Sequence, residues 1–126
     1  MGKDVDTLVA NALLTEFNQN QIYHDDLPEQ AVYPMIQYTD LTESPMLHAD
    51  NRLYSYQHII RVTIVTYGNA GINELKGKVY RCMIDAGFMW QNTNKVRDGK
   101  EYYTAMDFSI GVKTFFSLQN NINGGN

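Results

Sequence analysis

Apolar and polar residues alternate most regularly between about Leu53 and Tyr67. Ile60, Val62 and Ile64 are separated by single polar residues, and β-branched residues dominate the segment. This period of two predicts a long strand with one buried face. Residues 68–71, which contain two glycines, follow the strand. They predict a tight turn rather than a phosphate-binding loop, because no Lys-Ser or Lys-Thr pair comes after the last glycine.

Helical spacing replaces this alternation from about Asn73 to Ala86. Leu75, Val79 and Met83 recur at intervals of four, which is typical of an amphipathic helix. Gly87 follows, and glycine is the commonest residue just past a helix C-terminus. The segment therefore predicts one helix with a defined end.

A second helical pattern lies near the N-terminus, from Val5 to Phe17. Asp4 or Asp6 is suited to cap the start of this helix, and the polar run Asn18 to Gln21 is expected to end it. Leu14 lies off the apolar stripe, so the apolar arc is broad. A broad arc fits a helix that packs on two surfaces.

Further strands are predicted on both sides of the second helix. Tyr33 to Tyr38 forms one, and Pro34 at its start suits an edge or a first strand residue. Phe88 to Gln91 begins another. Asp98-Gly99 is a typical hairpin turn, and it leads into a last strand from about Tyr102 to Val112.

The connecting segments complete the expected fold. Ile22-Tyr23 is expected to be a short extended piece, Thr39 to Asn51 a long loop, and residues 119–126 a flexible tail. The order helix, strand, strand, helix, strand, strand predicts one α+β domain over residues 1–126. We expect an antiparallel sheet of about four strands with the helices on one face.

Composition narrows the class of protein. Charged residues make up only 19% of the chain, against roughly 25% on average, and there are nine tyrosines. Tyrosine is enriched at protein interfaces, which favours oligomerisation, although tyrosines half-buried at the rim of a monomer explain the same numbers. The net charge of −4 and ten lysines and arginines without a run disfavour nucleic-acid binding. No apolar run approaches the roughly 18 residues that a membrane span needs.

No sequence motif indicates catalysis. His24-Asp25-Asp26 is the densest set of metal-ligand residue types, but three adjacent side chains cannot easily converge on one ion, so a solvated acidic loop is expected. Cys82, the one cysteine, lies on an apolar helix stripe and is expected to be a buried structural thiol without a disulfide. We expect no catalytic residue, metal or cofactor.

The charged residues of the second helix lie on one face, and a second stripe flanks them, formed by Asn73, Gly77, Tyr80 and Ile84. Glycine inside a helix costs roughly 1 kcal/mol relative to alanine, so Gly77 indicates that another backbone approaches closely. That backbone belongs either to the chain's own sheet or to another subunit. The candidate subunit-interface residues are Asn73, Gly77, Tyr80, Ile84 and Leu14.

Five segments occur in a characteristic order. They are Tyr33-Pro34-Met35-Ile36-Gln37-Tyr38, then Pro45, the strand ending Val62-Thr63-Ile64-Val65, the helix closing Met83-Ile84-Asp85-Ala86-Gly87-Phe88, and Tyr102-Tyr103-Thr104-Ala105-Met106-Asp107-Phe108. In this order and spacing the chain resembles, over about residues 5 to 112, the tail completion or tail terminator proteins of long, non-contractile-tailed phages. It departs from the family pattern at Asp107, where a basic residue is expected before the aromatic.

The resemblance implies a structural protein rather than an enzyme. Such a protein forms a homo-oligomeric ring, commonly a hexamer, on the last ring of the tail tube, stops tube growth and presents a surface to the head connector. Its implied partners are the tail tube protein and the head-tail connector protein. It is implied to lie at the tail-head junction of the virion, and in the host cytoplasm during assembly. A free subunit that stays monomeric until it meets the tail is compatible with this role.

Two expectations follow for the ring. The acidic balance suits a lumen through which DNA passes without being held, so we expect no specific nucleic-acid binding; an electropositive lumen would contradict this. The segment Thr39 to Asn51 is the candidate contact with the tube or connector, mobile in the free subunit and ordered in the assembly. The contact candidates are Leu41, Met46 and His48 of this segment, together with Arg52, which follows it directly.

Two alternative functions remain open. A head-closure or connector ring of the phage neck would share the size, the charge and the lack of catalytic motifs. A small α+β enzyme or ligand-binding dimer would need a polar pocket, for which His58, Arg61 and Tyr67 are the candidates. Strand alternation places Arg61 and Tyr67 on one face and His58 on the other, which disfavours this pocket.

Overall fold

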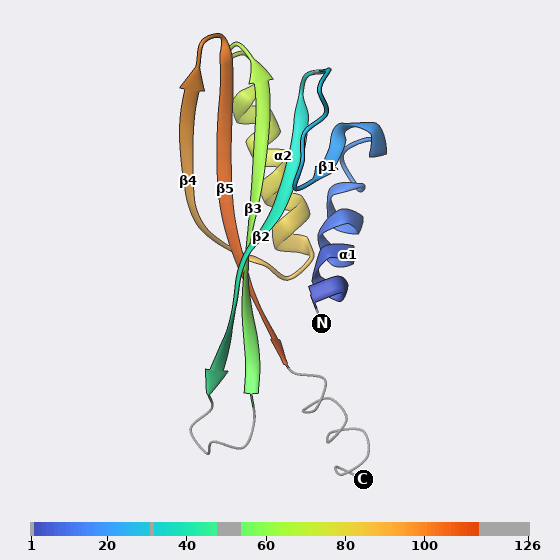
Figure 1. The fold of residues 1–126 in the computed structure, drawn as a ribbon, viewed down its shortest axis with the longest axis vertical. Coiled ribbons are helices and arrows are strands. Elements are labelled where there is room, and N and C mark those ends of the chain that lie inside the picture. The colour runs from blue at the N-terminus through green and yellow to red at the C-terminus, as the bar shows by residue number, and fades with distance from the viewer. Residues whose placement is uncertain (1, 31, 48–53, 114–126) are drawn as a thin grey trace.

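The computed structural model describes residues 2–30, 32–47 and 54–113. They form two α-helices, one turn of 3₁₀ helix at Gln19–Gln21 and a five-stranded sheet (Figure 1). The elements in chain order are α1 (Gly2–Leu13), β1 (Ile22–His24), β2 (Met35–Leu47), β3 (Tyr54–Tyr67), α2 (Ile72–Asp85), β4 (Met89–Asp98) and β5 (Glu101–Lys113).

The strands lie side by side in the order β1-β2-β3-β5-β4. β1 runs parallel to β2, and the other neighbouring pairs are antiparallel. Both helices cover the same face of the sheet, with α1 on the side of β1 (Figure 1). The predicted α+β class is confirmed, with one strand more than the approximate number expected.

The core lies between the sheet and the two helices. Ile60, Val62 and Ile64 are completely buried, as their alternation in β3 predicts. Phe108 of β5, paired with Ile60, is also completely buried. Burial of such a side chain stabilises the fold by roughly 1.5–3 kcal/mol. The helices contribute Val5, Val9, Leu13, Val79, Cys82 and Met83 to the same cluster.

β1 is the short extended piece expected at Ile22-Tyr23, and it continues to His24. It pairs with residues 36–38 of β2, so it forms one lateral edge of the sheet. The His24 ring stacks on Tyr38 of β2, with ring centroids 4.6 Å apart. This contact joins the edge strand to the core, because Tyr38 is buried.

The long loop expected from Thr39 to Asn51 is wrong for residues 39–47. These residues continue β2, and they pair with β3 as far as Leu47 opposite Tyr54. Pro45 and its polar neighbours favour a turn locally, but the partner strand supplies ladder hydrogen bonds that outweigh local propensity. Pro45 is tolerated because, among the strands that the structure describes, none pairs with the other side of β2 at this point. Residues 48–51 lie outside the described residues.

The first helix also differs from prediction. α1 begins at Gly2, so Asp4 and Asp6 lie inside it and neither caps its start. It ends at Leu13 rather than at the run Asn18 to Gln21. The Thr15 hydroxyl donates a hydrogen bond to the Ala12 carbonyl at 2.7 Å. Such a bond competes with the helical pattern.

The remaining boundaries agree closely with the sequence patterns. α2 begins and ends one residue earlier than expected, and the hairpin turn after Asp98 is present. β4 extends to Asp98, well past the start expected at Phe88 to Gln91. Gly68 and Gly71 in the turn between β3 and α2 have φ of +86° and +79°, which explains the need for glycine there. The predicted tail at 119–126 lies outside the described residues.

One end of the sheet projects beyond the helices (Figure 1). We call this projection the arm, and define it as residues 42–47 of β2 and 54–59 of β3. The paired residues of the arm run from Thr42 opposite Ile59 to Leu47 opposite Tyr54. A bulge at Leu41 marks the start of the arm. Bulges bend a strand and increase its twist, so a bend in β2 is expected where the arm begins.

Candidate functional site

The stripe predicted on α2 lies next to the free lateral edge of the sheet. Within the described residues β4 pairs only with β5, so its other side carries unpaired backbone groups. Gly77 and Tyr80 face a hollow of about 470 Å³ that is also lined by Trp90 of β4. We call this surface the α2–β4 edge. Its exposed large apolar side chains are Tyr80, Met89, Trp90 and Val96.

Among the described residues, Gly77 has no close neighbour from another element. A Cβ atom at this position would meet only the guanidinium of Arg81, at 3.5 Å, which is ordinary contact. The chain's own sheet therefore does not explain the glycine. Of the other stripe residues, Asn73 is exposed and Ile84 is half-buried.

Two basic side chains of β4 are held beside Tyr102 of β5. Lys95 Nζ lies 5.4 Å from the centre of the Tyr102 ring and donates a hydrogen bond to the Asn69 side chain at 2.9 Å. The Arg97 guanidinium lies 5.7 Å from the same ring and donates to the Gly99 carbonyl at 2.9 Å. These contacts hold positive charge at the α2–β4 edge in a defined position.

The opposite edge of the molecule has a smaller hollow, of about 200 Å³. Leu14, the remaining interface candidate, lines it and is 45% exposed. The structure thus separates the five interface candidates into two groups, at opposite lateral edges of the sheet. We call this second surface the α1–β1 edge. Its hollow is lined by Ala10, Leu14, Gln19, Ile22, His24 and Tyr38.

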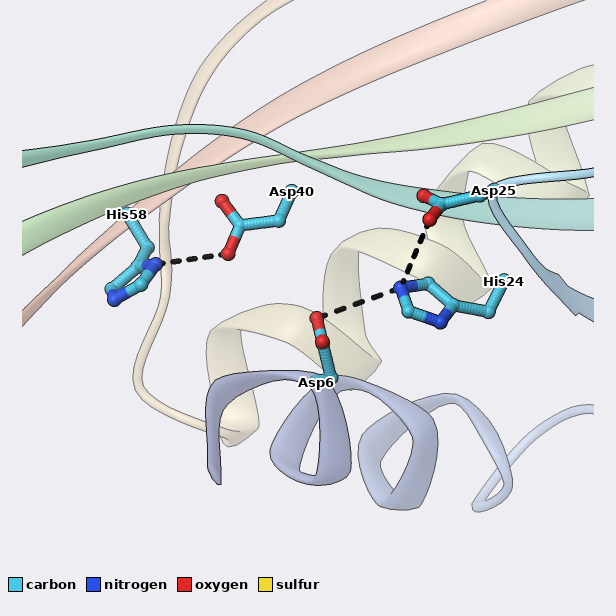
Figure 2. A network of polar contacts seen from close by, with 5 residues as sticks. All are labelled: Asp6, His24, Asp25, Asp40 and His58. Carbon is cyan, nitrogen blue, oxygen red and sulfur yellow. Dashed lines mark hydrogen bonds and ion pairs between the residues drawn. The ribbon is translucent and has the colours of Figure 1, made fainter. Parts of the chain in front are cut away.

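A polar network surrounds this edge (Figure 2). His24 Nε2 lies 3.7 Å from a carboxylate oxygen of Asp6 and 3.6 Å from one of Asp25. His58 is buried, and its Nδ1 lies 3.0 Å from Asp40 Oδ2. The part of the chain that the structure describes contains no group of three or more histidine, cysteine, aspartate or glutamate side chains arranged to hold a metal ion.

Charge is divided between the two edges. No lysine or arginine occurs between Asp4 and Asn51, a stretch that includes β1, β2 and most of α1. The α1–β1 edge and the connection after β1 carry Asp6, Asp25, Asp26 and Glu29. The α2–β4 edge and its hairpin turn carry four basic residues, Lys76, Lys95, Arg97 and Lys100, and the acidic residue Asp98.

The face of the sheet opposite the helices carries an ion pair. Arg61 donates two hydrogen bonds to Asp107, from Nε at 2.8 Å and from Nη2 at 3.1 Å. The hydrogen bonds to Asp107 raise the pKa of the Arg61 guanidinium, although its burial opposes this. The two residues face each other in register across β3 and β5. Asp107, which departs from the family pattern, therefore has a partner of opposite charge.

The polar pocket considered for an enzyme does not form. His58 is buried on the helix side of the sheet, whereas Arg61 is paired with Asp107 on the other side. Tyr67 is exposed at the far end of β3, where its ring contacts Tyr33. The separation expected from strand alternation is therefore present.

Cys82 is buried on the inner side of α2, as its position on the apolar stripe predicts. Its Sγ lies 3.4 Å from the Thr15 hydroxyl. Burial raises the pKa of the thiol. Because the thiolate is the reactive form, the thiol is poorly suited to act as a nucleophile.

The predicted tube or connector contacts fall on the arm or near it. Leu41 is the bulged residue and is 43% exposed, and Met46 lies in the arm. His48 and Arg52 lie outside the described residues. Neither α1 nor α2, the α-helices of the described segments, is long and apolar enough to cross a membrane.

Comparisons with known proteins give matches in structure but not in sequence. No protein-family model matches the chain, and no curated protein sequence matches it. Among solved structures, a chain from the "Virion of native gene transfer agent (GTA) particle" superposes with a TM-score of 0.54 and 12% sequence identity. The alignment covers 83% of this chain and 92% of that chain. The likeness is one of fold.

Sequence patterns alone did not reveal the two charged edges. Counting lysines and arginines along the chain shows no run, because Lys76 and the residues of β4 are distant in sequence. The usable signal was the absence of lysine and arginine between Asp4 and Asn51, which marks this stretch of the chain as acidic. Trp90 was also missed as a surface residue, since the bulge at Gln91 alters the alternation of β4.

Proposed function

We propose that this chain is a structural protein of a tailed phage that forms a ring on the end of the tail tube, ends tube growth and joins the tail to the head connector. The fold likeness to a virion chain over 83% of the sequence is the observation that carries this proposal. The order of patterned segments shared with tail terminator proteins gives it the finer role.

The structure provides two kinds of surface that such a ring needs. The two lateral edges offer exposed apolar side chains for contacts between copies. The arm extends away from the helices and offers a contact with the tube or the connector (Figure 1). A ring on a tube needs one pair of surfaces for contacts within the ring and another for contacts along its axis, and this arrangement of edges and arm supports the proposal.

The experiment is a stop codon early in this gene in its parent phage, with the lysate imaged by negative-stain electron microscopy. We expect DNA-filled heads beside unattached tails that are abnormally long or ragged. The same phage supplied with the chain from a plasmid is the control, and its tails should regain normal length. Normal tails beside emptied heads would instead assign the chain to head closure, and intact virions would overturn the structural role.

A further inference from the structure

We propose that the α1–β1 edge of one copy binds the α2–β4 edge of the next copy, so that the ring is held by contacts between an acidic and a basic edge. This inference rests on the proposed function and specifies how its subunits meet. The surfaces differ from each other and lie on opposite sides of one subunit (Figure 1). A contact between two different surfaces is heterologous, and heterologous contacts form a ring when the rotation between neighbouring copies closes.

The charges of the two edges are complementary. The stretch from Asp4 to Asn51, which forms most of the α1–β1 side, contains no lysine or arginine. This side carries Asp6, Asp25, Asp26 and Glu29. The α2–β4 side carries Lys76, Lys95, Arg97 and Lys100. Two copies that met through the same edge would bring like charges together, which disfavours that pairing by several kcal/mol. Charge therefore selects the head-to-tail arrangement.

Gly77 is explained by the same contact. A glycine inside α2 lowers helix stability, and no other helix or strand of the described segments approaches it. Gly77, Tyr80 and Trp90 line one hollow, and an exposed Leu14 stands beside the hollow on the opposite edge. A neighbouring copy that reaches the α2 backbone at Gly77 would cover these side chains.

The test reverses the charge of each edge in the full-length chain. Asp26→Lys/Glu29→Lys replaces two of the four acidic side chains of the α1–β1 edge with basic ones, and Lys95→Glu/Arg97→Glu replaces two of the four basic side chains of the α2–β4 edge with acidic ones. All four side chains are exposed, so the fold should tolerate the changes. The matched control is Glu74→Lys/Asp85→Lys, which makes the same charge change on exposed positions of α2 away from the hollow.

Each variant is supplied from a plasmid to the phage that carries the stop codon, and plaque titre is measured. We expect each reversal alone to lower the titre by at least about 100-fold, because like charges then meet at every contact. The control variant should support a titre close to that of the unchanged chain. Circular dichroism of each purified variant reports whether it is folded.

Co-expression of the two defective variants is the decisive measurement. Where the two variants alternate around the ring, each contact joins either two unchanged edges or two substituted edges, so the substituted side chains again face opposite charges. We expect the titre to recover to within about tenfold of the unchanged chain. A chain that carries all four substitutions should recover as well. Misfolded chains would not rescue each other.

Two results would overturn the inference. One is full titre from both single reversals, and the other is folded variants that fail to recover together. Either result leaves the proposed function intact if the stop codon itself gives long or ragged tails. Intact virions from the stop codon alone would remove the proposed function before any edge variant is compared.

Discussion

At the scale of single residues, the open face of the sheet is organised by paired polar side chains. Arg61 and Asp107 form a two-bond ion pair, and the Tyr33 hydroxyl donates to a carboxylate oxygen of Glu101. The Tyr103 hydroxyl donates to the other oxygen of Glu101 at 3.1 Å. Sequence alternation predicts which strand residues share this face, but the pairing of Arg61 with Asp107 depends on the register of β3 and β5, which local patterns do not contain.

Tyr33 yields a prediction for alkaline pH. The hydrogen bond to Glu101 raises the pKa of Tyr33 from 10.0 to about 12. Because the folded pKa is higher than the unfolded value, this contact stabilises the fold fully below about pH 10, and the stabilisation is lost as pH rises through about 12. Tyrosine ionisation can be followed by ultraviolet absorbance as pH is raised. We expect the difference between the wild-type curve and the Tyr33→Phe curve to show one transition centred near pH 12.

Glu101→Gln provides the control for this titration. It keeps the size of the acceptor and removes its charge, so the Tyr33 transition should move back toward pH 10. A wild-type transition already centred near pH 10 would show that the contact with Glu101 does not hold the Tyr33 proton.

At the scale of elements, local pattern and tertiary pairing each decided some boundaries. α2 was predictable to one residue at each end, because its apolar spacing and Gly87 agree with its packing. The second half of β2 was not predictable, because Pro45 and the polar residues around it favour a turn. Its extended form depends on residues 54–59 of β3, and sequence alone does not show that partnership.

Gly77→Ala separates the stability of α2 from its contact with a neighbour. The added methyl meets only Arg81 at ordinary distance, so the free energy of unfolding of the isolated chain should rise by roughly 0.5–1 kcal/mol. The same variant should complement the stop-codon phage less well, because the methyl occupies the site of close approach. Denaturant unfolding and plaque titre are the two measurements.

Asp85→Ala is the matched control on the outer face of the same helix. It should leave the titre unchanged. If Gly77→Ala stabilises the chain and also complements as well as the unchanged chain, no neighbouring backbone approaches α2 at this point.

At the scale of the whole molecule, the main feature is the separation of charge across the sheet. The net charge of −4 hides an acidic half and a basic edge. Sequence reasoning identified residues from both edges as interface candidates, namely Leu14 and the stripe with Gly77. It could not place them on opposite sides, because that depends on the strand order of the sheet.

Association between copies should therefore weaken with salt. Raising the ionic strength from about 0.1 M to about 1 M shortens the screening length from about 10 Å to about 3 Å. We expect sedimentation equilibrium of the concentrated chain to show less self-association at high salt. The variant Asp26→Lys/Glu29→Lys should depend much less on salt, because its α1–β1 edge then carries as many basic as acidic side chains. Self-association of the unchanged chain that increases with salt would contradict an electrostatic contact.

The position of β5 has a consequence for the order of folding. β5 is the last described element of the chain, yet it lies between β3 and β4 and pairs with both. During synthesis β3 and β4 therefore emerge before β5, the strand that lies between them. The long-range pairing of each of them with β5 must wait until β5 has been made. Until β5 arrives, the α1–β1–β2–β3 part and the α2–β4 part share no ladder. The subunit thus becomes competent for assembly only after nearly all of the described chain has been made.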